Sequence, residues 1–326
     1  MKPDPIIDTT SLLHFWQPRY WPTWLGFCLL RLLVLLPLRA QRGAAAILGR
    51  LGLLFARRRR SIAATNLRLC FPELGEQARQ DLLRRHFASL AQQLIEAGMS
   101  AWASDARVRR LWRVEGLEHL QGALAAGRGV ILMSGHFAAV EFSGRRLCMD
   151  APGMAAIYRP NRNPLVDGFL LRVRRRSAPN LIPKDSIRRF IRRLAAGDVV
   201  WYAPDQSFRR KGSMLVPFLG VPAMTNTALS SLARISGAPV VPYFAARRAD
   251  GAGYELRVEP PLADFPGTDP AADALRVNAI IERHIRLAPE QYFWVHRRFK
   301  GRPEPFADPY ARPGGDPPPG SPATSA

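Results

Sequence analysis

Short runs of β-branched and aromatic residues recur through the middle of this chain of 326 residues, and segments with helical spacing lie between them. GVILMS (residues 129–134), AAIYRP (155–160) and DVVWYA (198–203) predict buried strands. Further along, PVVPYFAARR turns at Asp250-Gly251 into YELRVEPP, which predicts an antiparallel hairpin at one edge. Strands that alternate with helices favour a mostly parallel sheet flanked by helices on both faces. We therefore expect an α/β fold.

The N-terminal region is strongly apolar. WLGFCLLRLLVLLPL (residues 24–38) is interrupted only by Arg31 and follows an aromatic cluster typical of a membrane interface. Fifteen residues is short for a bilayer span, and a count from Trp21 gives 18, which is at the lower limit. A buried helix of a soluble protein is the alternative. The basic run at 57–60 would place the rest of the chain on the cytoplasmic side. We expect an N-terminal hydrophobic membrane-anchor helix and interfacial region within 1–60.

The remainder divides into two parts. We expect residues 61–304 to form the catalytic domain, linked to the anchor by an amphipathic helix over residues 72–99. Residues 305–326 are rich in Pro, Gly, Ser and Asp, which predicts a disordered tail.

The composition restricts the partners of the chain. There are 47 Lys and Arg residues against 26 Asp and Glu, a formal net charge of +21, which favours an anionic partner. Nucleic acid is disfavoured because the aromatic residues that would stack on bases are concentrated in the N-terminal stretch and in strand interiors. The three cysteines, Cys28, Cys70 and Cys148, have no CxxC spacing, so neither a disulfide framework nor a zinc cluster is indicated.

His136 follows the first predicted strand and precedes Glu141 by five residues. On a regular helix this spacing separates two side chains by about 140°, so they can meet only if the helix begins between them. A neutral imidazole held by a carboxylate is the base-and-orienter part of a catalytic triad. A buried histidine satisfied by a helix N-terminus is the alternative. Since GxSxG, HExxH, GxxxxGK[ST] and GxGxxG are absent, the nucleophile is expected to belong to the substrate.

Polar residues follow two other predicted strands. Arg159 and Arg162 lie in YRPNRNP, and APDQSFRRKGS carries Asp205 together with Arg209 and Lys211. The carboxyl ends of parallel strands share one edge of a sheet, where ligands bind, so these side chains are expected near His136. Solvated surface loops are the alternative for each segment taken alone.

These motifs, taken together, resemble a known family, the late acyltransferases of lipid A biosynthesis, in the lauroyl (HtrB-like) group of the lysophospholipid acyltransferase superfamily. The resemblance runs from about Phe15 to Glu304. It is carried by PRYWPTWLG, NLRLCFPEL, the HxxxxE at His136 and Glu141, YRPNRNP, WYAPDQSF, VPFLGV and PEQYFWVHRRFKGRPE.

The resemblance implies transfer of a fatty acyl chain from acyl carrier protein to a hydroxyacyl chain of the Kdo-bearing lipid A precursor. The reaction would take place at the cytoplasmic face of the inner membrane, in contact with its lipids, through a single N-terminal anchor and with no metal or organic cofactor. A related membrane O-acyltransferase that acts on another lipid hydroxyl, in an ornithine lipid or a lysophospholipid, is the alternative.

The resemblance also implies roles for individual residues. His136, held by Glu141, would remove the proton from the acceptor hydroxyl. The expected substrate-binding residues are Arg159, Asn163, Asp205, Arg209, Lys211 and Arg297, with the arginines and the lysine near glucosamine phosphates. The acidic carrier protein would meet the arginines of residues 172–176 or of residues 188–193.

Overall fold

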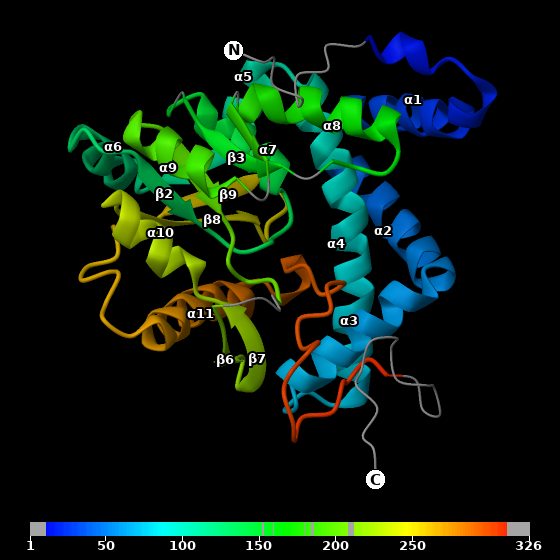
Figure 1. Cartoon of the computed structure of the whole chain (residues 1–326). Helices are drawn as coiled ribbons and strands as arrows, with labels where there is room; N and C mark the ends of the chain where they lie inside the picture. Colours follow the sequence, from blue (N-terminus) through cyan, green and yellow to red (C-terminus); the bar gives the residue numbers. More distant parts are fainter. Residues whose placement is uncertain are drawn as a thin grey trace.

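The computed structural model describes residues 11–151, 153–158, 160–178, 180–183, 186–207 and 212–311. Its centre is a seven-stranded sheet of order β1-β9-β8-β2-β5-β3-β4, in which only β8 and β9 pair antiparallel (Figure 1). This confirms the predicted α/β class with a mostly parallel sheet. The strands are β1 (Trp112–Glu115), β2 (Val130–Met133), β3 (Ala155–Tyr158), β4 (Asn180–Pro183), β5 (Val199–Tyr202), β8 (Val240–Arg247) and β9 (Tyr254–Val258).

The apolar run of β2 is buried on both faces of the sheet, as expected for a central parallel strand. Because side chains alternate along a strand, Ile131 and Met133 enter one hydrophobic cluster while Val130 and Leu132 enter another. The two clusters are the two layers of the core, one on each side of the sheet.

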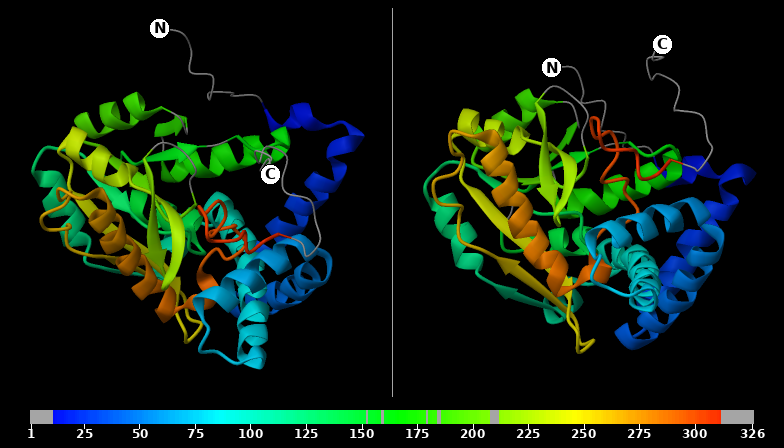
Figure 2. Two further views of the ribbon diagram at one scale, coloured as in Figure 1. Left: turned by 60° about the horizontal axis from the view of Figure 1, so that its bottom comes forward. Right: turned by 90° about the horizontal axis from the view of Figure 1, so that it is seen from below.

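Helices cover both faces. One cluster takes residues from α9 (Ile187–Ala195), α10 (Ala228–Ser236) and α11 (Pro270–Leu287), and the other takes residues from α5 (Asp105–Leu111), α6 (Leu117–Ala125) and α7 (Val140–Cys148). The long helix α4 (Glu76–Trp102) stands beside the sheet and contributes to both clusters, with Phe87 in the first and Ile95 in the second (Figures 1 and 2). The helix α8 (Pro164–Ser177) packs on α7.

The structure differs from the predicted strands in three places. The β8–β9 hairpin is not at the edge of the sheet, because β1 pairs parallel to β9 outside it. The short strands β1 and β4 were not predicted. The helix expected over residues 225–237 begins only at Ala228, since β7 (Val221–Asn226) pairs antiparallel with β6 (Ser213–Phe218) in a separate hairpin.

The N-terminal apolar region forms two helices, α1 (Trp21–Leu35) and α2 (Leu38–Phe55), and the basic run then opens α3 (Arg57–Cys70). In the described part of the chain, no helix has both the length and the hydropathy that a membrane crossing requires. The predicted transmembrane helix is therefore not found there, because α1 ends after 15 residues, just before Pro37. Arg31 faces the protein: its guanidinium donates to the Trp102 carbonyl at 3.5 Å and lies over the indole ring.

The start of the C-terminal tail is ordered. The Tyr310 hydroxyl accepts from the Phe299 amide at 3.0 Å and is hydrogen-bonded to the Asn66 side chain on α3. The prediction of disorder from residue 305 is thus wrong for residues 305–311. It rested on amino-acid composition, which gives no information about a single contact such as that of Tyr310 with α3. Residues 312–326 lie outside the described residues.

Candidate active site

His136 and Asp205 meet at the carboxyl edge of the sheet. β2 and β5 are neighbouring parallel strands with Met133 opposite Tyr202, and each of the two polar residues lies three positions beyond its strand. The distance between His136 Nδ1 and Asp205 Oδ1 is 2.6 Å, and the His136 backbone amide donates to Asp205 Oδ2 at 2.8 Å. The register of two non-consecutive strands therefore assembles the pair.

This geometry fixes the state of the imidazole. A carboxylate only accepts hydrogen bonds, so Nδ1 of His136 carries the hydrogen and Nε2 is the basic nitrogen. Burial opposes the charge of both groups, but their mutual attraction and hydrogen bonds prevail. The pKa of His136 is raised above its ordinary value, and the pKa of Asp205 is lowered to about 2. Asp205 is 1% exposed, whereas the His136 side chain keeps 32% of its surface accessible.

A C-terminal segment completes the surroundings of Asp205. The Phe293 amide donates to the His136 carbonyl at 3.0 Å, and the buried Tyr292 side chain is hydrogen-bonded through its hydroxyl to the Asp205 carboxylate. Ser207, two residues beyond Asp205, donates its amide to His296 Nε2 at 3.2 Å. Tyr292 and His296 were not predicted as site residues, although both lie in the quoted segment PEQYFWVHRRFKGRPE.

Glu141 does not orient His136. It lies in the first turn of α7, and its Oε1 accepts from Nε and Nη2 of Arg174 on α8 at 2.8 and 2.6 Å. The predicted His136–Glu141 hydrogen bond is therefore replaced by His136–Asp205. The reason is that α7 begins only at Val140, which leaves Glu141 facing α8, while the adjacent strand brings Asp205 to the imidazole.

The family model for bacterial lipid A biosynthesis acyltransferases matches residues 9–301. The chain belongs to this family. The predicted resemblance is confirmed, and the protein is an acyltransferase of lipid A biosynthesis.

Curated relatives match the acyltransferase over most of its length. The lipid A biosynthesis lauroyltransferase of Escherichia coli (strain K12) is 41% identical over 91% of this chain and 96% of its own. The lipid A biosynthesis palmitoleoyltransferase of the same organism is 40% identical over 89% of this chain and 94% of its own. The lipid A biosynthesis myristoyltransferase of that organism is 29% identical over 91% of this chain and 93% of its own.

Among solved structures, the 1-acyl-sn-glycerophosphate acyltransferase PlsC of Thermotoga maritima is similar with a TM-score of 0.37 and 14% sequence identity. The similarity covers 76% of this chain and 97% of that one.

Two other predicted substrate-binding residues are engaged within the protein. Asn163 is the N-cap of α8, where its Oδ1 accepts from the Leu165 amide at 3.0 Å, and its Nδ2 donates to Thr23 on α1. Arg297 donates to Asp308 at 3.1 Å and lies over the Tyr310 ring. Their side chains thus have structural partners in the acyltransferase.

The other predicted substrate-binding residues are Asp205, Arg159, Arg209 and Lys211. Asp205 lies at the site, but its carboxylate is hydrogen-bonded to His136 and Tyr292, which differs from the predicted role of a substrate ligand. Arg159, Arg209 and Lys211 lie outside the described residues. Within the described ranges, no group of three His, Cys, Asp or Glu side chains is arranged to hold a metal ion.

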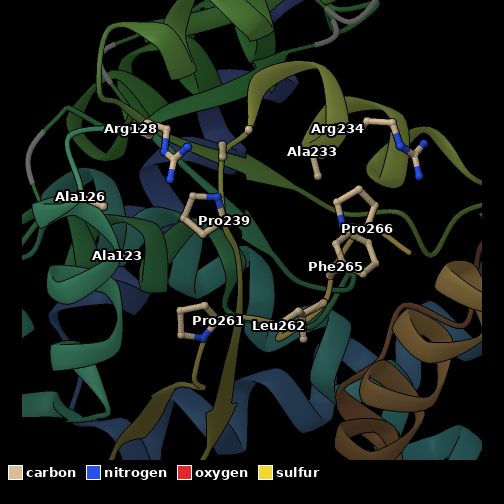
Figure 3. Close-up of a pocket in the computed structure, with 12 residues that line it drawn as sticks. Ala123, Ala126, Arg128, Ala233, Arg234, Pro239, Pro261, Leu262, Phe265 and Pro266 are labelled. Carbon is tan, nitrogen blue, oxygen red and sulfur yellow. The ribbon is translucent and has the colours of Figure 1, made fainter. Parts of the chain in front are cut away.

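A surface hollow of about 490 Å³ lies elsewhere on the acyltransferase (Figure 3). Arg128 and Pro239, which precede β2 and β8, are on its lining, together with Arg234, Pro261 and Phe265. The hollow is therefore at the amino edge of the sheet, opposite the edge that carries His136, and it is not part of the candidate active site.

Proposed function

We propose that the enzyme transfers a fatty acyl chain from acyl carrier protein to a hydroxyacyl chain of the Kdo-bearing lipid A precursor. Family membership supports the pathway, and the 41% identical relative, a lauroyltransferase, supports a lauroyl-type donor. The observation that carries the chemistry is the His136–Asp205 hydrogen bond at the carboxyl ends of β2 and β5.

In this proposal His136 is the general base. Its Nε2 takes the proton of the acceptor hydroxyl as the oxygen attacks the thioester carbonyl, and the resulting tetrahedral intermediate expels the carrier thiolate, which receives that proton. Asp205 holds the imidazole through Nδ1 and stabilises the imidazolium that forms during the reaction. Glu141, through Arg174, anchors α7 to α8 beside the site.

We further propose that Arg159, Arg209 and Lys211 bind the glucosamine phosphates. Arg159 follows the last residue of β3 directly, and Arg209 comes four residues after Asp205. The carboxyl edge of a parallel sheet gathers ligands at such positions, and a guanidinium matches the geometry of a phosphate.

We propose that α1 and α2 dock on one leaflet of the inner membrane and place the catalytic domain on its cytoplasmic side. Large apolar side chains on both helices are exposed, with Leu29 53% and Phe55 81% accessible. The set also includes Leu25, Leu32 and Leu35 of α1 and Ile47, Leu51 and Leu54 of α2. The exposed arginines 57–60 begin just after Ala56 and would lie at the anionic head groups.

The deciding experiment incubates the purified enzyme with lauroyl acyl carrier protein and the Kdo-bearing lipid A precursor, and follows the lipid product by mass spectrometry. We expect the mass of the precursor to rise by one lauroyl group. Parallel reactions offer an ornithine lipid and a lysophospholipid. Acylation of one of these with none of the lipid A precursor would overturn the proposal.

A further inference from the structure

We propose that α9 is the surface on which the acyl carrier protein docks, through Arg188 and Arg192. This inference rests on the proposed function, because it assumes that the donor is a thioester of an acidic carrier protein. The sequence contains two arginine-rich segments that could make this contact, residues 172–176 on α8 and residues 188–193 on α9. Their surroundings in the structure differ.

The arginines of α8 are committed to the acyltransferase itself. Arg174 is paired with Glu141 and lies 5.7 Å from the centre of the Tyr158 ring, and Arg176 donates to the Ala101 carbonyl. Arg172 and Arg175 also have interactions within the protein. This segment therefore holds α8 in place and offers few cations to a partner.

The arginines of α9 are arranged differently. Phe190 and Leu194 are 2% and 1% exposed and fix the helix on the core of the sheet. Arg188 and Arg192 are four residues apart, so they share one helical face, and both are exposed with no partner in the ranges that the structure describes. Ile187, at the start of the helix, is 63% exposed and adds an apolar contact to this cationic face.

The position of Arg188 is electrostatically unfavourable for the isolated enzyme. It lies in the first turn of α9, where the helix dipole disfavours cations, and this turn contains no acidic residue. An acidic partner would remove this penalty, since its carboxylates would meet both the arginines and the positive end of the helix. Charge complementarity of this kind raises association rates and selects partners.

The location of α9 fits a protein partner better than a lipid surface. α9 connects β4 to β5, so it begins at the carboxyl edge of the sheet, where His136 lies, and runs back across one face. In all three views α9 lies across the sheet from α1 and α2, whose exposed apolar side chains form the proposed membrane face (Figures 1 and 2). A partner on α9 would therefore approach from the side away from the bilayer.

The test is charge reversal in the full-length enzyme. In Arg188→Glu/Arg192→Glu, we expect the KM for lauroyl acyl carrier protein to rise by about tenfold or more, because two attractive contacts become repulsive. The kcat at saturating carrier and the KM for the lipid acceptor should stay within about twofold of wild type, since α9 contacts neither reacting group. Added salt should raise the wild-type KM for the carrier protein and so reduce its difference from the KM of the charge-reversal variant.

Two control variants define the outcomes. Arg110→Glu/Arg286→Glu makes the same change of charge at exposed positions on α5 and α11 and should leave the carrier KM unchanged. Arg188→Lys/Arg192→Lys should retain most of the affinity. An unchanged carrier KM in the α9 reversal variant, or a fall in kcat alone, would refute the docking surface. If that variant lost affinity for anionic vesicles and kept its carrier KM, α9 would be a lipid-binding helix. Failure of the wild-type enzyme to use the carrier thioester would instead refute the proposed function.

Discussion

Asp205 is a buried carboxylate that receives hydrogen bonds from the His136 ring, the His136 amide and the Tyr292 hydroxyl. Such bonds stabilise the charged form and offset the cost of its burial. The pKa of Asp205 is lowered from 3.8 to about 2, so its stabilising contribution is present above pH 3.8 and is lost as the pH falls through 2. The carboxylate is thus ionised at any pH where the base can work.

Tyr292→Phe removes one of these donors. The Asp205 carboxylate then becomes more basic and attracts the His136 imidazolium more strongly, so the pKa of His136 should rise. The acid limb of the pH dependence of kcat/KM should therefore move to higher pH. Tyr310→Phe, which loses hydrogen bonds to Asn66 and Phe299, is the control and should leave the limb in place. A limb that does not move in Tyr292→Phe would exclude Tyr292 as a positioning residue.

The sequence predicted the position of His136 at a strand end but not the hydrogen-bond partner of its imidazole. His136 was placed at a strand end from the apolar run before it, and Asp205 was selected as a substrate ligand. Their contact depends on β2 lying beside β5, with β3 and β4 between them in the chain, and short-range spacing contains no information about that pairing. The five-residue spacing therefore favoured Glu141.

Between elements, a buried ion pair connects α4 to β8. Arg247 donates to both carboxylate oxygens of Glu96, at 2.6 and 2.8 Å, and Glu96 is fully buried. Arg247 also donates to the Ser89 carbonyl at 3.0 Å, so the pair holds the middle of α4 against the sheet.

Glu96→Gln removes the ion-pair partner of the Arg247 guanidinium, whose side chain is only 10% exposed. We expect the free energy of unfolding to fall by about 3 to 5 kcal/mol, as measured by urea denaturation. Glu115→Gln breaks the exposed pair with Arg257 and should cost less than about 1 kcal/mol. Equal losses in the two variants would contradict a structural role for the buried pair.

Among the elements, hydrophobic patterning located the strands β2, β3, β5 and β8, which are mainly apolar runs, and β9, in which buried apolar residues alternate with Glu255 and Arg257. The edge strands β1 and β4 were missed because each buries only one of its residues, so neither forms a continuous apolar run. The helix after His136 was expected within FAAVEFSGRRL, but it begins late, because Ala139 adopts a left-handed conformation with φ of 64°.

At the surface of the whole molecule, the exposed apolar side chains of α1 and α2 predict binding to lipid vesicles that added salt does not reverse. Leu29→Ser/Leu51→Ser/Phe55→Ser should release a large fraction of the enzyme, because each large apolar side chain contributes about 1.5 to 3 kcal/mol when it leaves water. Sedimentation with vesicles measures the bound fraction. Leu275→Ser/Leu287→Ser changes exposed leucines on α11 and should sediment like wild type. Release by salt alone would contradict the apolar docking of α1 and α2.

At the scale of the whole chain, composition predicted an apolar N-terminal region and a polar C-terminal end, but not their contacts. Arg31 on α1 reaches Trp102 at the end of α4, and Tyr310 reaches Asn66 on α3. Single contacts between segments so distant in sequence leave no periodic pattern, so the fold class was predictable and these connections were not.

In the proposed mechanism His136, held by Asp205, is the general base. The most direct measurement is the pH dependence of lauroyl transfer by the wild-type enzyme, His136→Ala and Asp205→Asn. His136→Ala should lower kcat by about 10² to 10⁴ across the profile. In Asp205→Asn the carboxylate that raises the pKa of His136 is gone, so the remaining activity should be low and its acid limb should move to lower pH. Transfer by His136→Ala at nearly the wild-type rate, or an acid limb in Asp205→Asn at the wild-type position, would refute these roles of His136 and Asp205.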